Sequence, residues 1–243
     1  MIAELERAGF DVLTRNHAAA ILAGDFPGEL SGLVEVLMGF RIGVAELLSG
    51  GGGEAAFTQR LRHDLSARGW PKHVFTVQTI VDGVEQASIG HEIDHVRRAP
   101  AGTLALEIEW NNKDPFYDRD LENFQRLHRQ SALSVGIIVT RGAGMQDAFL
   151  QSIAARLAAD GVTDAAGLAR YGIEERTAAQ RRAVARLEAG GLSFAEAFTR
   201  NFVGSKYGQA TTHWAKLATR VARGVGNPCP LLLIGLPPSV IDG

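Results

Sequence analysis

Three acidic residues near the middle of the chain are spaced so that they can hold a divalent cation. In TLALEIEW, residues 103–110, side chains alternate as in a strand, which puts Glu107 and Glu109 on one face. A hairpin turning at residues 99–102 would bring Asp94 close to Glu107. Mg²⁺ binds oxygen ligands, usually one or two carboxylates together with waters and a substrate phosphate. Such an ion polarises a phosphoryl oxygen and lowers the pKa of bound water, which is the chemistry that phosphodiester hydrolysis requires.

The same spacing has a simpler interpretation, a solvated strand face on which Glu107 and Glu109 only meet water. Acids two residues apart are common in strands, and the interval between Asp94 and Glu107 is long. His91 and His95 flank Asp94, but their spacing along a strand does not make a zinc site. Spacing alone therefore leaves the magnesium and solvated-face interpretations open.

Patterns around the acids predict the elements that must position them. β-branched residues and the turn Asp82-Gly83 predict a strand at 73–81, with further strands at 84–98 and 103–110. The run LSVGIIVT, residues 133–140, is apolar on both faces and predicts an interior strand with helices on both sides. CPLLLIGL, residues 229–236, predicts a last strand. Apolar spacing predicts helices in the ranges 1–48, 55–67, 116–130, 145–159 and 174–222.

Local signals refine these elements. Ser193, and Thr211 or Thr212, are expected to cap two helices in the last third of the chain. The glycine run at residues 50–53 is typical of a flexible loop. Cys229 lies in an apolar run and is expected to be a small buried residue rather than a reactive thiol.

Composition is that of an ordinary globular protein. The 243 residues are 46% hydrophobic and 21% charged, which fits one domain. Its longest apolar run is too short to cross a bilayer, no targeting signal is evident, and a single cysteine excludes an internal disulfide. We therefore expect a cytoplasmic protein without a membrane partner. The net charge of −2 alone argues against nucleic-acid binding, although acids that hold cations also cancel basic residues elsewhere.

Four patches resemble, in order and spacing, the restriction endonucleases of the BglII type. These enzymes carry an NHA-x-x-IL start, an IDF-like segment with a metal-binding Asp, a TLVE-x-Q-like strand and an apolar strand ending in IITKG. The corresponding patches here are NHAAAIL (Asn16–Leu22), IDHV (93–96), TLALEIEWNN (103–112) and SVGIIVTRG (134–142). The similarity spans residues 16–142 in patches and fades in the last third.

The resemblance implies an α/β fold, with a mixed central sheet flanked by helices and a PD-(D/E)xK core. It implies a single nuclease domain, 1–243, with a helical N-terminal region (1–70), a catalytic sheet core (71–160) and a helical C-terminal region with a final strand (161–243). The implied activity is Mg²⁺-dependent cleavage of double-stranded DNA at a short palindrome by a homodimer, with a companion methyltransferase protecting host DNA. Two alternatives are a repair or recombination nuclease with the same core and a DNA-binding module without activity.

Site roles follow residue by residue from the resemblance. Asp94, Glu107 and the carbonyl of Ile108 match positions that hold the metal. Glu109 stands where that family has Gln, and with Glu107 it forms a BamHI-like Glu-x-Glu pair. A water oriented by Glu109 would attack the phosphorus in line with the leaving 3′ oxygen. One departure is that the interval between Asp94 and Glu107 is longer than in the BglII type.

The resemblance also touches residues outside the acidic strand. Thr58 stands where the family has an active-site Asn, so Thr58 or the neighbouring Gln59 is a candidate for orienting water. Arginines of the helix 116–130 lie on one face, where they contact phosphate or a second subunit, or merely pair with the helix's own acids. The basic residues expected to contact DNA are Lys113, Arg119, Arg141, Lys206 and His213. Arg141 would contact phosphate or a base, whereas solvated surface is the alternative for Lys206 and His213.

Overall fold

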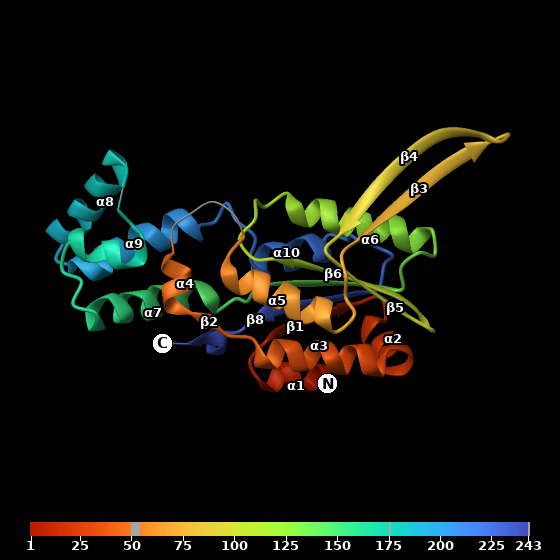
Figure 1. Cartoon of the computed structure of the whole chain (residues 1–243), viewed down its shortest axis with the longest axis horizontal. Coiled ribbons are helices and arrows are strands. Elements are labelled where there is room, and N and C mark those ends of the chain that lie inside the picture. Colours follow the sequence, from red (N-terminus) through yellow and green to blue (C-terminus); the bar gives the residue numbers. More distant parts are fainter. Residues whose placement is uncertain (50–53, 175, 243) are drawn as a thin grey trace.

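A mixed five-stranded sheet, in the order β1-β8-β7-β6-β5, forms the centre of the protein (Figure 1). The computed structural model describes residues 1–49, 54–174 and 176–242, so the predicted glycine loop at 50–53 lies outside the described residues. Strands β6, β7 and β8 are parallel, whereas β1 and β5 run antiparallel to their neighbours. The strands are β1 (Asp11–Arg15), β5 (His95–Ala99), β6 (Gly102–Glu109), β7 (Val135–Arg141) and β8 (Leu231–Leu236).

Helices cover both faces of this sheet, which confirms the predicted α/β architecture. One face packs against α1 (Ile2–Arg7), α2 (Ala18–Asp25), α3 (Pro27–Gly39), α4 (Val44–Leu48), α5 (Ala56–Ala67) and α7 (Met145–Ala159). The other face packs against α6 (Phe116–Arg129) and α10 (Trp214–Ala222). Beyond α7 lie α8 (Ala178–Ala189) and α9 (Phe194–Lys206), and the short strands β2 (Ile42–Gly43) and β9 (Ile241–Asp242) pair in parallel.

Alternation along β6 divides its side chains between the two layers, as the sequence predicted. Leu106 and Ile108 enter the core beneath α3 and α5, whereas Ala105 enters the core beneath α6. Strand β7 is buried along its whole length, so it is the interior strand expected from its apolar run. Its Gly136 leaves room for the ring of Phe124, because a Cβ at this position would overlap that ring. This close approach sets α6 directly over the face that carries Glu107 and Glu109.

A long hairpin of β3 (His73–Val81) and β4 (Val84–Ile93) projects from the body of the protein (Figure 1). Its turn is the predicted Asp82-Gly83 pair, in which both residues have positive φ. Most of the hairpin is solvent-exposed, and its base meets the second layer through the buried Ile93. Five large apolar side chains are exposed along it: Val74, Ile80, Val81, Val84 and Ile89.

Two predicted elements were wrong in the first half of the chain. The range 1–48 was expected to be helical throughout, but it contains the edge strand β1 and the short β2. The five residues of β1 are only half-buried, and their strand conformation depends on pairing with β8 near the other end of the chain. The stretch 84–98 was expected to be one strand, but it breaks at Asp94 into β4 and β5.

Signals in the last third of the chain gave a mixed outcome. Ser193 caps α9 as predicted, with its hydroxyl accepting a hydrogen bond from the backbone N–H of Glu196. The predicted threonine cap of α10 was wrong, because that helix begins after His213 and the buried Thr212 hydroxyl bonds to Asn112 instead.

Cys229 is buried as expected. Within the described residues, none of the helices has the length and apolar character needed to span a membrane.

Candidate active site

The break between β4 and β5 places Asp94 beside the acidic end of β6. Because His95 pairs with Leu106, the next step of the antiparallel ladder sets Asp94 opposite Glu107. The backbone N–H of Asp94 donates to Oε2 of Glu107 at 3.2 Å. The predicted juxtaposition of Asp94 with Glu107 is therefore confirmed.

The acidic end of β6 has a strand neighbour on one side only. Glu107 pairs with Ile138 and Glu109 with Thr140 of β7, whereas the ladder with β5 ends at Leu106. Residues 107–109 consequently run past the end of β5 toward Asp94. Glu107 is 3% and Glu109 is 2% exposed. The solvated-strand interpretation is therefore wrong, because α6 covers this face.

A fourth carboxylate, which sequence reasoning missed, joins the cluster from α6. Asp120 is completely buried, and its Oδ1 accepts from Arg119 at 2.7 Å. Its Oδ2 is buried without a hydrogen-bond partner in the described part of the chain. Asp120 follows Tyr117 by three residues and precedes Phe124 by four, so it falls on the apolar stripe of an amphipathic helix. An acid on such a stripe was the available signal.

Burial and mutual repulsion control the charge of these acids. Burial, followed by the neighbouring Asp120 and Asp94, raises the pKa of Glu107 well above its usual value. Burial and then Asp120 raise the pKa of Glu109 in the same direction. The cation nearest to Glu109 is Arg119, whose Nη2 lies 3.7 Å from Oε1 and whose side chain is half-exposed. The cluster therefore holds more potential negative charge than its surroundings compensate.

The donors at this point are hard oxygen atoms of the kind that Mg²⁺ prefers. They are the carboxylates of Asp94 and Glu107, which lie together, and, as a proposed third ligand, the backbone carbonyl of Ile108, a residue that lines the adjoining cleft. Among residues 1–49, 54–174 and 176–242, no three His, Cys, Asp or Glu side chains are arranged as a metal-binding group. Two carboxylates and a carbonyl nevertheless suit Mg²⁺, which usually keeps waters and binds substrate phosphate. The crowding of buried carboxyl groups also fits a cation here, because a bound cation would compensate their charge when they ionise.

Two clefts meet at Asp94. The first has a volume of about 480 Å³ and opens on the α5 side, where Thr58, Arg62 and Ile108 line it. The second has a volume of about 500 Å³ and lies between the base of the β3–β4 hairpin and α6, with Glu107 and Glu109 in its wall. Asp94 lines both clefts, so a group bound at its carboxylate is reachable from either side.

Helix α5 supplies both candidate water-orienting residues, but it directs them differently. Thr58 is buried and lines the first cleft together with Asp94 and Ile108. Gln59 is exposed, donates to the carbonyl of Glu54 at 3.1 Å, and reaches only a shallower recess that also borders Asp94. Of the two, the structure brings Thr58 to the cleft that Ile108 lines.

Arg62 is a second residue that sequence reasoning missed. Its guanidinium lies 3.9 Å from Oδ1 of Asp94 and pairs with Glu54 at 2.8 Å. Arg62 follows Thr58 by four residues, one turn of α5, so both side chains face the first cleft. That spacing was present in the sequence, but it carried no signal until Asp94 had been placed beside it.

The basic residues proposed to contact DNA are distributed unevenly. Lys113 is exposed four residues past the end of β6, and the half-exposed Arg119 lies over the Phe116 ring in the second cleft. The ammonium of Lys206 donates to the carbonyls of Leu47 and Ser49 at 3.1 and 2.8 Å while lining the first cleft.

Two of the proposed DNA contacts lie on the side of the α7 N-terminus. His213 is half-buried, and burial followed by Arg141 lowers its pKa. Arg141 is 2% exposed, and its guanidinium donates to the Tyr207 and Thr212 carbonyls and to the Thr211 hydroxyl, so its proposed contact with DNA stays a prediction.

Comparison with known proteins identifies the family of this chain. Residues 10–236 match the family described as restriction endonuclease BglII/BglIII, a span that includes the whole five-stranded sheet. A comparison with curated proteins gives no significant match. Because the family match covers nearly the entire chain, the protein belongs to the restriction endonuclease BglII/BglIII family, for which DNA is the substrate.

Proposed function

We propose that this protein is a type II, site-specific deoxyribonuclease that hydrolyses double-stranded DNA at a short palindrome and depends on Mg²⁺. The observation that carries the proposal is the convergence of Asp94 with Glu107 at the end of β6, in a chain of this family. In this proposal the arrangement is a PD-(D/E)xK-type site in which Glu109 stands in place of the usual Lys.

Asp94, Glu107 and the Ile108 carbonyl would hold the ion, which when bound polarises the phosphoryl oxygen and acidifies a water. Glu109 shares the buried face with Glu107 and is oriented by the Asn112 amide, which donates to Oε2 at 2.7 Å. In this proposal Glu109 accepts a hydrogen bond or a proton from the attacking water. Thr58 offers a hydroxyl on the opposite cleft for orienting a second water.

In this proposal the basic side chains that border the clefts bind the phosphates of DNA. Arg62 and Arg119 flank the acids from opposite sides, and the exposed Lys113 lies four residues past the end of the catalytic strand. Contacts of this kind fix the position of the duplex without reading its sequence. Lys206 and His213 remain candidates at the periphery of the site.

We further expect a homodimer in which each subunit cuts one strand, because two-fold symmetry matches a palindromic site. Sedimentation should give a dimer on a cognate duplex, and both strands should be cut. A monomer both free and bound to cognate DNA would contradict this expectation. In the cell, such an activity requires a companion methyltransferase that protects the host's DNA.

Plasmid digestion tests the proposed function. With Mg²⁺ or Mn²⁺ we expect discrete DNA fragments, with EDTA none, and with Ca²⁺ little cleavage, because the looser geometry of Ca²⁺ favours binding over chemistry. A smear would instead indicate a nuclease without sequence preference, and intact DNA a binding module. Full activity in EDTA would exclude the metal-dependent mechanism.

A further inference from the structure

Arg141, at the end of β7, is a buried cation whose hydrogen bonds all go to one neighbouring segment. Its Nε donates to the Thr212 carbonyl at 3.1 Å and its Nη1 to the Tyr207 carbonyl at 3.3 Å. Its Nη2 donates to the Thr211 hydroxyl at 2.6 Å and again to the Thr212 carbonyl at 2.7 Å. Within the described residues, no carboxylate forms an ion pair with it. A buried charge is costly, so this side chain needs a reason beyond filling space.

The segment that Arg141 holds is bonded in turn to the residues that follow β6. Thr212 and Asn112 exchange two hydrogen bonds: the Thr212 N–H donates to the Asn112 carbonyl at 2.9 Å, and the Asn112 N–H donates to the Thr212 hydroxyl at 3.1 Å. The side-chain amide of Asn112 then donates to Glu109 at 2.7 Å. An unbroken series of hydrogen bonds thus runs from Arg141 through Thr212 and Asn112 to Glu109.

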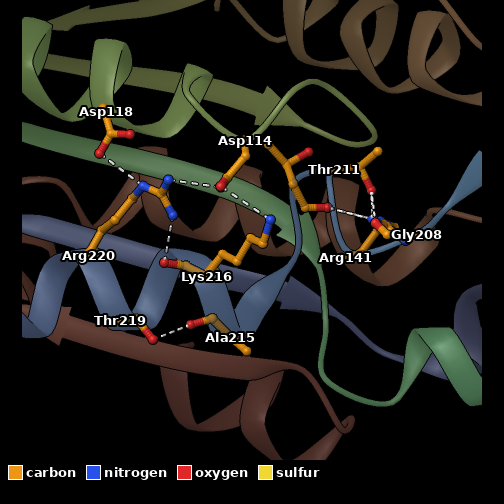
Figure 2. A network of polar contacts seen from close by, with 10 residues as sticks. Asp114, Asp118, Arg141, Gly208, Thr211, Ala215, Lys216, Thr219 and Arg220 are labelled. Atoms are coloured by element: carbon orange, nitrogen blue, oxygen red, sulfur yellow. Dashed lines mark hydrogen bonds and ion pairs between the residues drawn. The ribbon is translucent and has the colours of Figure 1, made fainter.

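A second set of contacts joins α10, which follows this segment in the chain, to Asp114 and Asp118 (Figure 2). Lys216 and Arg220 of α10 pair with Asp114 at 3.2 and 2.9 Å, and Arg220 also pairs with Asp118 at 2.9 Å. These ion pairs are partly solvated, and such pairs each contribute little, typically ~0–1 kcal/mol. The bonds of Arg141 lie in the interior, where a hydrogen bond is electrostatically stronger. Arg141 is therefore an interior restraint on residues 207–212.

We propose that Arg141 is a positioning residue that holds residues 207–212 against Asn112 and thereby fixes the Glu109 carboxylate for reaction. This inference rests on the proposed function, in which Glu109 orients the attacking water. A planar guanidinium can span the Tyr207, Thr211 and Thr212 acceptors at once, whereas a lysine ammonium is a single point of charge. The arginine fork, and not simply a positive charge, is thus the required feature.

Single-turnover cleavage by Arg141→Lys, Asn112→Ala and the double variant tests this role. We expect each single variant to slow cleavage about 10- to 100-fold, because a misplacement of ~1 Å can cost ~100-fold in rate. The double variant should be no slower than the slower single variant, since both changes break the same series of bonds. DNA affinity measured in Ca²⁺ should change by less than about 3-fold. As a control, Arg156→Lys, in a partly solvated pair with Asp160, should match the wild type.

The proposal would be overturned if the rate losses of the two single variants multiplied in the double variant. It would also be overturned if Arg141→Lys cleaved DNA as fast as the wild type. An activity-independent measurement keeps it separate from the proposed function. The side-chain amide NMR signal of Asn112, assigned from its loss in Asn112→Ala, should shift in Arg141→Lys. An unchanged signal overturns the positioning role, whereas a shifted signal in a protein that cuts no DNA contradicts only the proposed function.

Discussion

Asp94→Asn is expected to abolish DNA cleavage while specific DNA binding is retained or strengthened. The substitution removes one of the two carboxylates proposed to hold the metal, and it also removes a negative charge that would face the phosphates. Asp94 is suited to this test because it lines both clefts and its side chain is only partly buried, so the fold should survive. Cleavage in Mg²⁺ and binding in Ca²⁺ should be measured on the same cognate duplex.

A matched control is Glu35→Gln, which neutralises an exposed acid paired with Arg68 at 2.8 Å on the opposite side of the sheet. That variant should cut at the wild-type rate, because exposed ion pairs contribute little. Ca²⁺ should also raise the melting temperature of the wild type and of Glu35→Gln, but not that of Asp94→Asn, because ligand binding stabilises only a protein that retains the site. Near wild-type cleavage by Asp94→Asn would show that Asp94 is not a metal ligand.

Glu109→Ala should reduce the rate of cleavage by at least ~100-fold, the low end of what a positioned acid–base group supplies. Glu109 shares its face of β6 with Glu107, lies under α6, and is fixed by the amide of Asn112. Glu109→Gln should be milder, since an amide still orients water by hydrogen bonding. Glu109→Lys should retain some activity by stabilising negative charge on the reacting phosphate.

Single-turnover cleavage with saturating enzyme is the appropriate measurement, because it separates chemistry from product release. DNA binding in Ca²⁺ should survive all three Glu109 variants. Glu107→Ala serves as the comparison, since it removes a proposed metal ligand and should be inactive. If Glu109→Ala cuts as fast as wild type while Glu107→Ala is inactive, Glu109 has no part in the reaction.

The portion of the site that could be predicted from the sequence is the portion determined by neighbouring strands. Alternation along β6 is local, and a short turn is enough to set Asp94 opposite Glu107. Asp120 was missed because its role depends on how closely α6 packs on the sheet, which Gly136 permits from another strand. Arg62 was missed because α5 had to be placed against the break at Asp94 first.

The burial of Arg141 and Thr212 was not predicted from the sequence. Arg141 was expected to contact DNA, and Thr211 or Thr212 was expected to cap α10, because loops at strand ends and polar residues before helices usually have these roles. In the structure the two residues are buried against each other, bonded through the Thr212 carbonyl. Their pairing joins segments about seventy residues apart, and no local pattern reports it.

The position of β8 has a consequence for how the protein is made. This strand lies between β1 and β7, so the first strand of the sheet has no partner until residues 231–236 have left the ribosome. During translation, β1 and one edge of β7 have no strand partner until β8 has been made. Unpaired strand edges are prone to aggregation, and pairing between strands far apart in the sequence makes folding slow. The sheet beneath the acidic site is therefore completed only after residues 231–236 have been synthesised. The five-stranded sheet that carries this site cannot assemble on a nascent chain that still lacks β8.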